Sequence, residues 1–179
     1  MLAKLLHLKG LKRRFYTHLV NKVFVGTHSF ERKRRLLNAI GYSIGEGTKV
    51  VGPLICTGKL TIGKDCWIGK NFLVNGNGSV TIGDNCDVAP EVTFMTGGHD
   101  IGTAERRAGD GRIFHQSVGN GTWIGGRLTV FNDTKIGNSC VIAGCACVIR
   151  DIPDNSLAGG VPAKVIRGLS DDDTGATEK

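Results

Sequence analysis

The residues best suited to chemistry lie in one polar segment, TGGHDIGTAERRAGDGRIFHQSVGNGTWIGG, at positions 96–126. It holds His99 and His115, two of the five histidines in the chain. An imidazole has an ordinary pKa of about 6.5, so it can accept a proton at neutral pH and act as a general base. Arg106 and Arg107 follow, and they suit either an anionic ligand or plain solvation. The segment is the first candidate for a functional site.

A six-residue repeat dominates the sequence on both sides of this segment. Glycine often follows the repeating apolar residue, as at Gly63 and Gly125, and Gly, Asn, Asp, Lys or Glu types fill the next two positions. These types tolerate the positive φ of tight corners. A second small or apolar residue stands four positions after most anchors, so each unit predicts a short strand and a turn with two inward side chains. The anchors are Ile44, Val50, Cys56, Ile62, Ile68, Val74, Ile82, Val88, Phe94, Val118, Ile124, Val130, Ile136, Ile142 and Val148.

Strands this short cannot bury a face alone, so they must coil and stack about 4.8 Å apart, which predicts a parallel β-helix. Roughly 13 units would give four to five coils. Phe94 and Val118 lie 24 positions apart, a multiple of six, so the coil can resume in register after extruding the loop at 95–117. At 179 residues the chain is long enough for one such domain. The loop would then sit on a rigid scaffold, a usual location for chemistry.

Positive charge is concentrated in the first 40 residues, which hold ten Lys and Arg residues and one acid, Glu31. Helical spacing here predicts one or two amphipathic helices that cover the N-terminal end of the coil, with Ser29 able to cap the second. The basic face is either solvated or in contact with an anionic membrane surface or a phosphate-bearing lipid-linked glycan. No apolar run is long enough to span a membrane and no clean signal-peptide core is present, which predicts a cytoplasmic protein, with the inner face of the membrane left open.

The six cysteines could suggest a disulfide scaffold or a metal site. Cys145 and Cys147 form a single C-x-C pair, and zinc would require a second pair or nearby histidines. The other four fall on predicted inward positions, where a small hydrophobic side chain packs well. We therefore expect structural thiols and no metal site. These four are Cys56, Cys66, Cys86 and Cys140.

The repeat, the GGHD and TWIGG strings and the closing segment DIPDNSLAGGVPAKVIRG resemble the hexapeptide-repeat acyltransferases, and are most similar to the sugar and polysaccharide O-acetyltransferases of the maltose/galactoside group. The resemblance implies an all-β fold, a left-handed parallel β-helix over residues 44–168, with an N-terminal helical cap at 1–43. The loop at 95–117 would be extruded from it. The polar residues 169–179 would form a disordered tail.

The resemblance also implies an activity. Family members of this kind transfer an acetyl group from acetyl-CoA to a sugar hydroxyl, as homotrimers with sites between subunits. Asp100 stands after His99 where the maltose and galactoside enzymes usually have Pro. This difference and the basic N-terminus look more like the enzymes that acetylate capsule, exopolysaccharide or O-antigen sugars. We therefore expect a glycan acceptor, direct transfer in a ternary complex and no nucleic-acid partner.

Carried over residue by residue, the resemblance assigns a role to each matching position. His99 would be the general base, Asp87 would orient or charge-stabilise it, and the backbone N–H of Gly126 would bind the oxyanion. Asn71 would contact the acceptor, and His115 would either contact it or pack the loop. The remaining assignments are contacts to the cofactor, by Trp123, Gly144, Arg150, Lys164 and Arg167.

Several alternatives stay open at this point. An N-acetyltransferase acting on serine, an antibiotic or an amino sugar would share the fold, and pH profiles with candidate acceptors would distinguish it. A trimeric β-helix carbonic anhydrase needs three zinc-binding histidines, whereas only His99 and His115 lie within or beside the coils. A non-catalytic scaffold would fail to bind coenzyme A. Trp123, Lys164 and Arg167 also fit an exposed corner aromatic and plain solvated charges.

Overall fold

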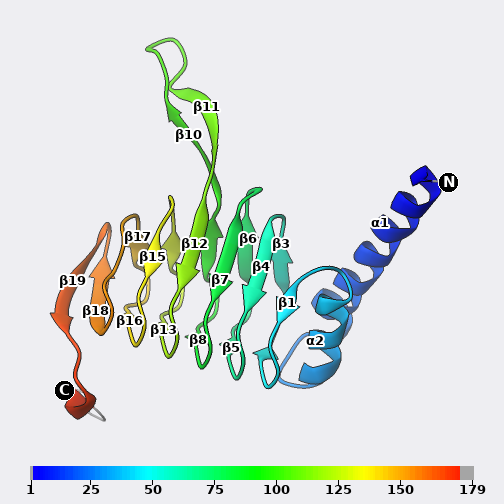
Figure 1. Ribbon diagram of the computed structural model, residues 1–179, viewed down its shortest axis with the longest axis horizontal. Helices are drawn as coiled ribbons and strands as arrows, with labels where there is room; N and C mark the ends of the chain where they lie inside the picture. The colour runs from blue at the N-terminus through cyan, green and yellow to red at the C-terminus, as the bar shows by residue number, and fades with distance from the viewer. Residues whose placement is uncertain (1, 174–179) are drawn as a thin grey trace.

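The computed structural model describes the backbone of residues 2–173 and the side chains of residues 10–173. Short parallel strands stack into three sheets that form the sides of a coil (Figure 1). The first sheet contains β1 (Ser43–Ile44), β4 (Lys59–Ile62), β7 (Ser79–Ile82), β12 (His115–Val118) and β15 (Lys135–Ile136). The second contains β2 (Lys49–Val50), β5 (Trp67–Ile68), β8 (Asp87–Val88), β13 (Trp123–Ile124), β16 (Val141–Ile142), β18 (Ser156–Gly160) and β19 (Ala163–Gly168). The third contains β3 (Leu54–Cys56), β6 (Phe72–Asn75), β9 (Thr93–Met95), β14 (Thr129–Val130) and β17 (Cys147–Val148). The predicted parallel β-helix is confirmed.

The coil is longer than the repeat predicts. Five complete coils each contribute one strand to every sheet. A sixth begins after Val148, because Ile152 bridges to Ile136 and Ala158 pairs with Ile142. The expectation of four to five coils is therefore low by about one. The six-residue pattern does not predict the sixth coil because the step from Val148 to Ile152 is only four residues.

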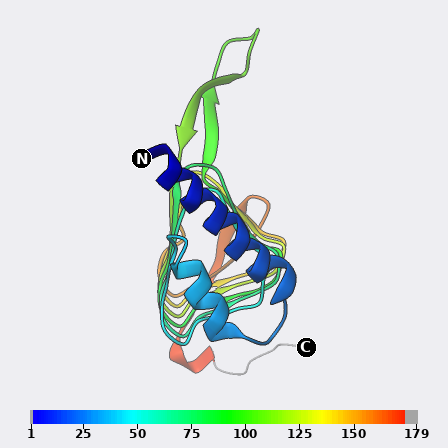
Figure 2. The same cartoon turned by 90° about the vertical axis from the view of Figure 1, so that its right-hand side faces the viewer.

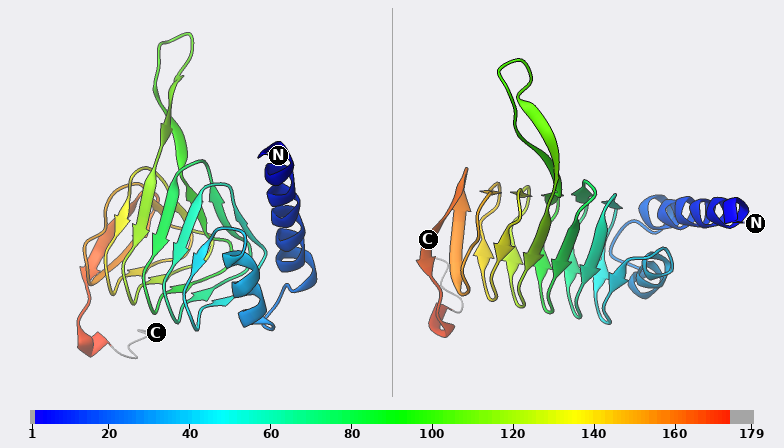
Figure 3. Two further views of the ribbon diagram at one scale, coloured as in Figure 1. Left: turned by 45° about the vertical axis from the view of Figure 1, so that its right-hand side comes forward. Right: turned by 45° about the horizontal axis from the view of Figure 1, so that its top comes forward.

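Almost all variation in coil length falls at one corner. The anchors of the first, second and third sheets follow one another at steps of six in every complete coil. From the third sheet to the first sheet of the next coil, the step is eight residues after Val74 and 24 after Phe94. The long step contains the hairpin of β10 (Gly97–Ile101) and β11 (Ala108–Ile113), which stands out from the coil in Figures 1 and 3. The predicted extruded loop is thus an antiparallel hairpin.

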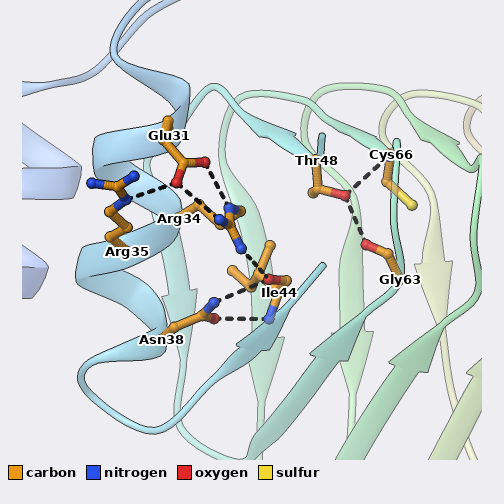
Figure 4. A network of polar contacts seen from close by, with 8 residues as sticks. All are labelled: Glu31, Arg34, Arg35, Asn38, Ile44, Thr48, Gly63 and Cys66. Carbon is orange, nitrogen blue, oxygen red and sulfur yellow. Dashed lines mark hydrogen bonds and ion pairs between the residues drawn. The ribbon is translucent and has the colours of Figure 1, made fainter. Parts of the chain in front are cut away.

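The core lies inside the coil and contains the side chains that the pattern points inward. Every predicted anchor from Ile44 to Val148 is buried, and so is the residue four positions later, such as Cys66 or Leu128, in every case except the half-buried Gly98. Phe72 and Phe94 pack with ring centroids 5.6 Å apart in neighbouring coils. Thr48 remains satisfied because its hydroxyl donates to the Gly63 carbonyl and accepts from the Cys66 N–H (Figure 4). All six cysteines are free thiols.

The glycines that follow many of the anchors are required by close stacking of the coils and not by a positive φ. The φ of Gly63 is not positive. A Cβ there would lie 2.6 Å from the backbone of Gly83 in the next coil, so the neighbouring coils leave no room for a side chain. Positive φ falls two residues later, at Asp65 and Asn85. The first corner glycine therefore permits close stacking, and the third corner residue makes the turn.

Helices close the N-terminal end of the coil, as Figure 2 shows along the coil axis. α1 (Leu2–His18) continues into the π-helix η1 (Leu19–Val23), and α2 (Phe30–Asn38) packs on β1 and β2. Val20 and Leu37 are buried in the coil's hydrophobic core. Asn38 fixes the junction, because its amide pairs with both the N–H and the carbonyl of Ile44 (Figure 4). The expected capping bond from the Ser29 side chain to α2 is absent, since Ser29 adopts a left-handed conformation.

The C-terminal end is an antiparallel pair, β18 and β19, followed by a short 3-10 helix, η2 (Asp171–Asp173). Residues 169–173 of the expected tail are therefore described, and 174–179 lie outside the described residues. Within residues 2–173, no helix combines the length and the apolar character needed to cross a membrane.

Candidate active site

The hairpin of β10 and β11 presents His99 on its first strand. Backbone pairing places His99 opposite Gly111, and a register shift follows between His99 and Ile101. The Asp100 carboxylate and the Arg112 guanidinium form an ion pair of 3.0 Å across the two strands. The His99 side chain is exposed and lines hollows on the hairpin. The imidazole therefore lies outside the coil, on the β10–β11 hairpin.

One hydrogen bond sets the tautomer of His99. The Nδ1 atom lies 2.9 Å from the Gly109 carbonyl oxygen on β11. A carbonyl only accepts, so Nδ1 carries a proton and donates it, which in the neutral ring leaves the lone pair on Nε2. Nε2 has no partner among the described residues. The ring is therefore held in the form that can accept a proton from a hydroxyl.

The base of the hairpin is tightly packed. Phe114 is nearly buried below β11, and its N–H donates to the Thr96 carbonyl at 3.0 Å. A Cβ on Gly98 would come within 2.8 Å of the Phe114 ring. A side chain at position 98 would therefore have to displace this ring. This packing fixes the position of β10 at Gly98, the residue before His99.

A second group of predicted residues lines the corner between the second and third sheets. Trp123, on β13 just before this corner, is 57% exposed. We call the corner with Trp123, Gly126 and Gly144 the Trp123 edge. The Gly126 carbonyl accepts from the Cys145 N–H of the next coil at 2.8 Å, whereas the Gly126 N–H has no acceptor among the described residues. Gly144 stacks on Gly126, since a Cβ on Gly144 would lie 3.2 Å from the Gly126 carbonyl oxygen. This corner therefore carries a free backbone donor and an exposed aromatic side chain, the groups that the resemblance assigns to an oxyanion site and a cofactor groove.

Asn71 lies on the same corner, two coils earlier. It has a φ of 60° and its side chain is exposed. In the next two coils the same corner positions are Glu91 and Arg127, which form an ion pair of 2.8 Å. Asn71 is therefore available to an external ligand, and its backbone conformation is the one that the corner requires.

Asp87 does not orient His99 within the chain. It pairs in register with Trp67 on one side and Trp123 on the other, in the second sheet. These three side chains surround a hollow completed by Val88, Ala89 and Pro90. The group that orients His99 here is the Gly109 carbonyl. A carboxylate of the same chain is not needed for that purpose.

His115 belongs to the first sheet, below the hairpin. Its Nδ1 lies 2.8 Å from the Ser79 hydroxyl oxygen, and its backbone N–H donates to the Asp133 carboxylate at 2.7 Å. The ring is exposed. These bonds join three successive coils at the corner from which the hairpin leaves. They are what the packing role predicts, and the exposed ring leaves acceptor contact open.

The remaining predicted cofactor residues are exposed but do not lie together. Lys164 and Arg167 are on β19, at the C-terminal end of the second sheet. Arg167 pairs with the Asp173 carboxylate at 2.8 Å, which occupies the guanidinium. The hydrogen bond from the Ser170 N–H, and after it the Arg167 guanidinium, lowers the pKa of that carboxyl. Arg150 follows β17 at the corner between the third and first sheets. It therefore lies on the same corner as the hairpin, away from Trp123.

The predicted site residues thus fall on two separate parts of one chain. His99 projects on the hairpin from one edge of the coil, and β13 lies near the opposite edge in Figure 1. The hollows that His99 lines contain neither Trp123 nor Gly126. Sequence reasoning missed Trp67, Gly109 and Arg112, whose spacing carries no recognisable signal. Among the side chains of residues 10–173, no three of the His, Cys, Asp or Glu type are grouped to hold a metal ion.

Comparison with known proteins identifies the family. No family model matches the sequence. The galactoside O-acetyltransferase of Escherichia coli (strain K12) is 34% identical over 149 residues, which cover 80% of this chain and 71% of that protein. The chain belongs to the hexapeptide-repeat acetyltransferases. A galactoside acetyltransferase solved in complex with coenzyme A has a TM-score of 0.69 and 30% identity, covering 97% of this chain and 87% of that chain.

A hexapeptide-repeat acetyltransferase from Vibrio cholerae, solved with acetyl coenzyme A, has a TM-score of 0.78. The match covers 92% of this chain and 89% of the Vibrio cholerae chain, at 23% identity. At that identity the likeness bears on the fold alone. The fold of this acetyltransferase is thus shared along most of its length.

Proposed function

We propose that this acetyltransferase transfers an acetyl group from acetyl-CoA to a sugar hydroxyl of a cell-surface polysaccharide or its precursor, such as a capsule, exopolysaccharide or O-antigen chain. Family membership makes the chain an acyltransferase with acetyl-CoA as its co-substrate. The sugar acceptor is supported by its similarity to a galactoside O-acetyltransferase. The polysaccharide role rests on Asp100 and the basic N-terminal segment.

In the proposed reaction, His99 Nε2 removes the proton from the acceptor hydroxyl while its oxygen attacks the thioester carbonyl. The C–O bond forms, and the carbonyl oxygen becomes an oxyanion that the Gly126 N–H stabilises. The C–S bond then breaks, the proton passes to the departing thiolate, and coenzyme A leaves as the thiol. No acyl-enzyme forms. Within the polar segment, the described hairpin offers no cysteine beside His99 to act as a nucleophile.

The observation that carries the proposal is the tautomer of His99, held by Gly109 with Nε2 unoccupied. A structural histidine would gain from bonds to both ring nitrogens. Here a backbone carbonyl fixes one nitrogen, and the other has no partner among the described residues, on an exposed side chain of the projecting hairpin. A general base requires this arrangement, in which one ring nitrogen is free to accept a proton from the substrate.

The active form is proposed to be a homotrimer with the site between subunits. The hairpin and the Trp123 edge do not meet in one chain, so a second copy is needed to bring His99 to the Gly126 N–H. The hairpin also exposes apolar surface to a neighbour, since Ile101 is 89% exposed. We place the reaction in the cytoplasm, with which the six free thiols are compatible.

Replacement of His99 tests the proposal. His99→Ala should lower turnover by about 10² to 10⁴ while coenzyme A affinity stays near that of the wild type. Turnover is followed by release of free thiol from acetyl-CoA with a panel of nucleotide sugars and oligosaccharides, and affinity by calorimetry. His28→Ala is the matched control, since it removes an exposed imidazole from the loop before α2, away from the hairpin and from the other candidate site residues. Undiminished turnover in His99→Ala would end the proposal.

A further inference from the structure

The helix α1 exposes apolar side chains that the proposed transfer reaction does not use. Leu11 and Phe15 are each 57% exposed, and they lie one turn apart on the same face of the helix. Val23, in the π-helix that follows, is also exposed. Neighbouring large apolar side chains in water usually mark a contact surface. We call Leu11 and Phe15 the apolar row.

This row faces away from the coil. Arg13 fixes the rotation of α1, because its guanidinium donates to the Tyr42 hydroxyl at 3.0 Å and to the Cys56 carbonyl at 3.3 Å. Residues two positions apart on an α-helix point to nearly opposite sides, and both Leu11 and Phe15 lie two positions from Arg13. Figures 1 and 3 show α1 beyond the N-terminal end of the coil and extending away from it. Apart from the adjacent Tyr16 ring, whose centroid lies 6.0 Å from that of Phe15, the apolar row has no partner among the described residues.

Basic side chains flank the apolar row. Lys12 lies on one side, and Arg14 and Lys22 lie on the other, where they also line a groove against Ile55. None of these three forms an ion pair among the described residues. The only acid among the first 40 residues, Glu31, is bound by two guanidinium groups that lower the pKa of its carboxyl to about 2. The positive charge around α1 is therefore not neutralised by its own segment.

We propose that α1 is a docking helix for a bilayer surface rich in anionic phospholipid. Leu11 and Phe15 enter the boundary between headgroups and acyl chains, while Lys12, Arg14 and Lys22 meet lipid phosphates. Exposed leucine and phenylalanine beside lysine and arginine suit this interface, since charge alone would favour any polyanion and the apolar row favours a membrane. The helix is anchored to the coil by Arg13 and by Asn21, whose amide pairs with the Leu54 backbone. Docking would thus hold the whole coil at the membrane surface.

Vesicle flotation with the full-length protein tests the docking surface. The protein should float with phosphatidylcholine vesicles that contain about one third phosphatidylglycerol, and not with pure phosphatidylcholine. Binding should weaken when the salt concentration rises from about 0.1 M to about 0.5 M, because lipid charge is screened. Absence of flotation with the anionic vesicles overturns the proposal, as does binding to double-stranded RNA without binding to vesicles.

Two double variants locate the surface. Arg14→Gln/Lys22→Gln should lower the vesicle partition coefficient about 30-fold, at about 1 kcal/mol for each basic residue. Leu11→Ser/Phe15→Ser should also lower the vesicle partition coefficient, and this variant should no longer bind the vesicles at moderate salt. Arg106→Gln/Arg107→Gln removes the same charge from the hairpin and serves as the matched control. Equal loss in that control would show attraction by net charge alone and overturn the proposal.

Docking is distinguishable from the transfer reaction. The Leu11 and Phe15 variants should acetylate a water-soluble acceptor at the wild-type rate, because both side chains lie outside the described active-site residues. Thermal midpoints near that of the wild type would verify that these exposed substitutions leave the fold intact. Flotation without His99-dependent turnover would support docking and refute the proposed reaction.

Discussion

At the scale of single residues, the least expected group is a buried lysine in the cap. Lys33 on α2 is fully buried, and its ammonium donates to the carbonyls of Gly26 at 2.7 Å and Val51 at 3.1 Å. It also lies 4.8 Å from the centroid of the Phe30 ring. Burial lowers the pKa of Lys33 to about 8 from its ordinary value of 10.5. The cation joins the α2 helix, the preceding loop and the first coil, at a cost in desolvation.

Lys33 should therefore make stability depend on pH. Below pH about 8 both folded and unfolded chains hold the proton, and the full cost of burying the charge is present. Between about 8 and about 10.5 the unfolded chain binds more protons, so the free energy of unfolding should gain a contribution that rises with pH. Lys33→Met should lack this contribution. Urea unfolding of both proteins across this range measures the difference.

The comparison isolates Lys33 because other titrating groups, such as Tyr42, are common to both proteins. Burial raises the pKa of Tyr42, which acts in the opposite direction as pH rises. Lys49→Met, at an exposed position on β2, is the control and should keep the wild-type pH dependence. Identical slopes for wild type and Lys33→Met would refute the linkage.

At the scale of the elements, the coil depends on how closely successive corners stack. Gly63→Ala would place a Cβ 2.6 Å from the Gly83 backbone, at a position where neither chain segment can move without breaking the ladder on both sides. Overpacking of this kind should lower the free energy of unfolding by about 2 kcal/mol or more. Gly111→Ala on the hairpin is the matched control, because nothing lies within 4 Å of its Cβ. Chemical denaturation of the two variants should separate them, and equal stabilities would contradict the stacking argument.

The same elements show what the sequence can predict. The positions of anchors such as Ile62 and Val130 follow from the period, because a side chain that must point inward recurs wherever the coil turns. The hairpin was predicted only as a loop, since GGHDI and AGDGRI lack the alternation that marks a strand. The stacking role of Gly63 was missed because it depends on Gly83, a contact between coils that local sequence does not reveal. The orienting role of the Gly109 carbonyl could not be foreseen either, because a backbone group has no sequence signature.

At the scale of the whole molecule, one chain carries two halves of a proposed site that do not meet. His99 projects from one edge of the coil, and Trp123 and Gly126 lie on another. If each site combines the hairpin of one subunit with the Trp123 edge of the next, two different defects can compensate each other in a mixed trimer. If each chain acted alone, they could not.

Mixing two inactive variants therefore decides between these cases. His99→Ala supplies an intact Trp123 edge, and a second variant, Trp123→Ala, supplies an intact hairpin. In trimers reassembled from equal amounts, about one quarter of the sites should contain both intact halves and regain activity. Acetyl transfer is measured after unfolding and refolding the mixture together, with the separately refolded proteins combined afterwards as the control. Activity of the co-refolded mixture that stays at the control level would place both halves in one subunit, and the argument for a site between subunits would fail with it.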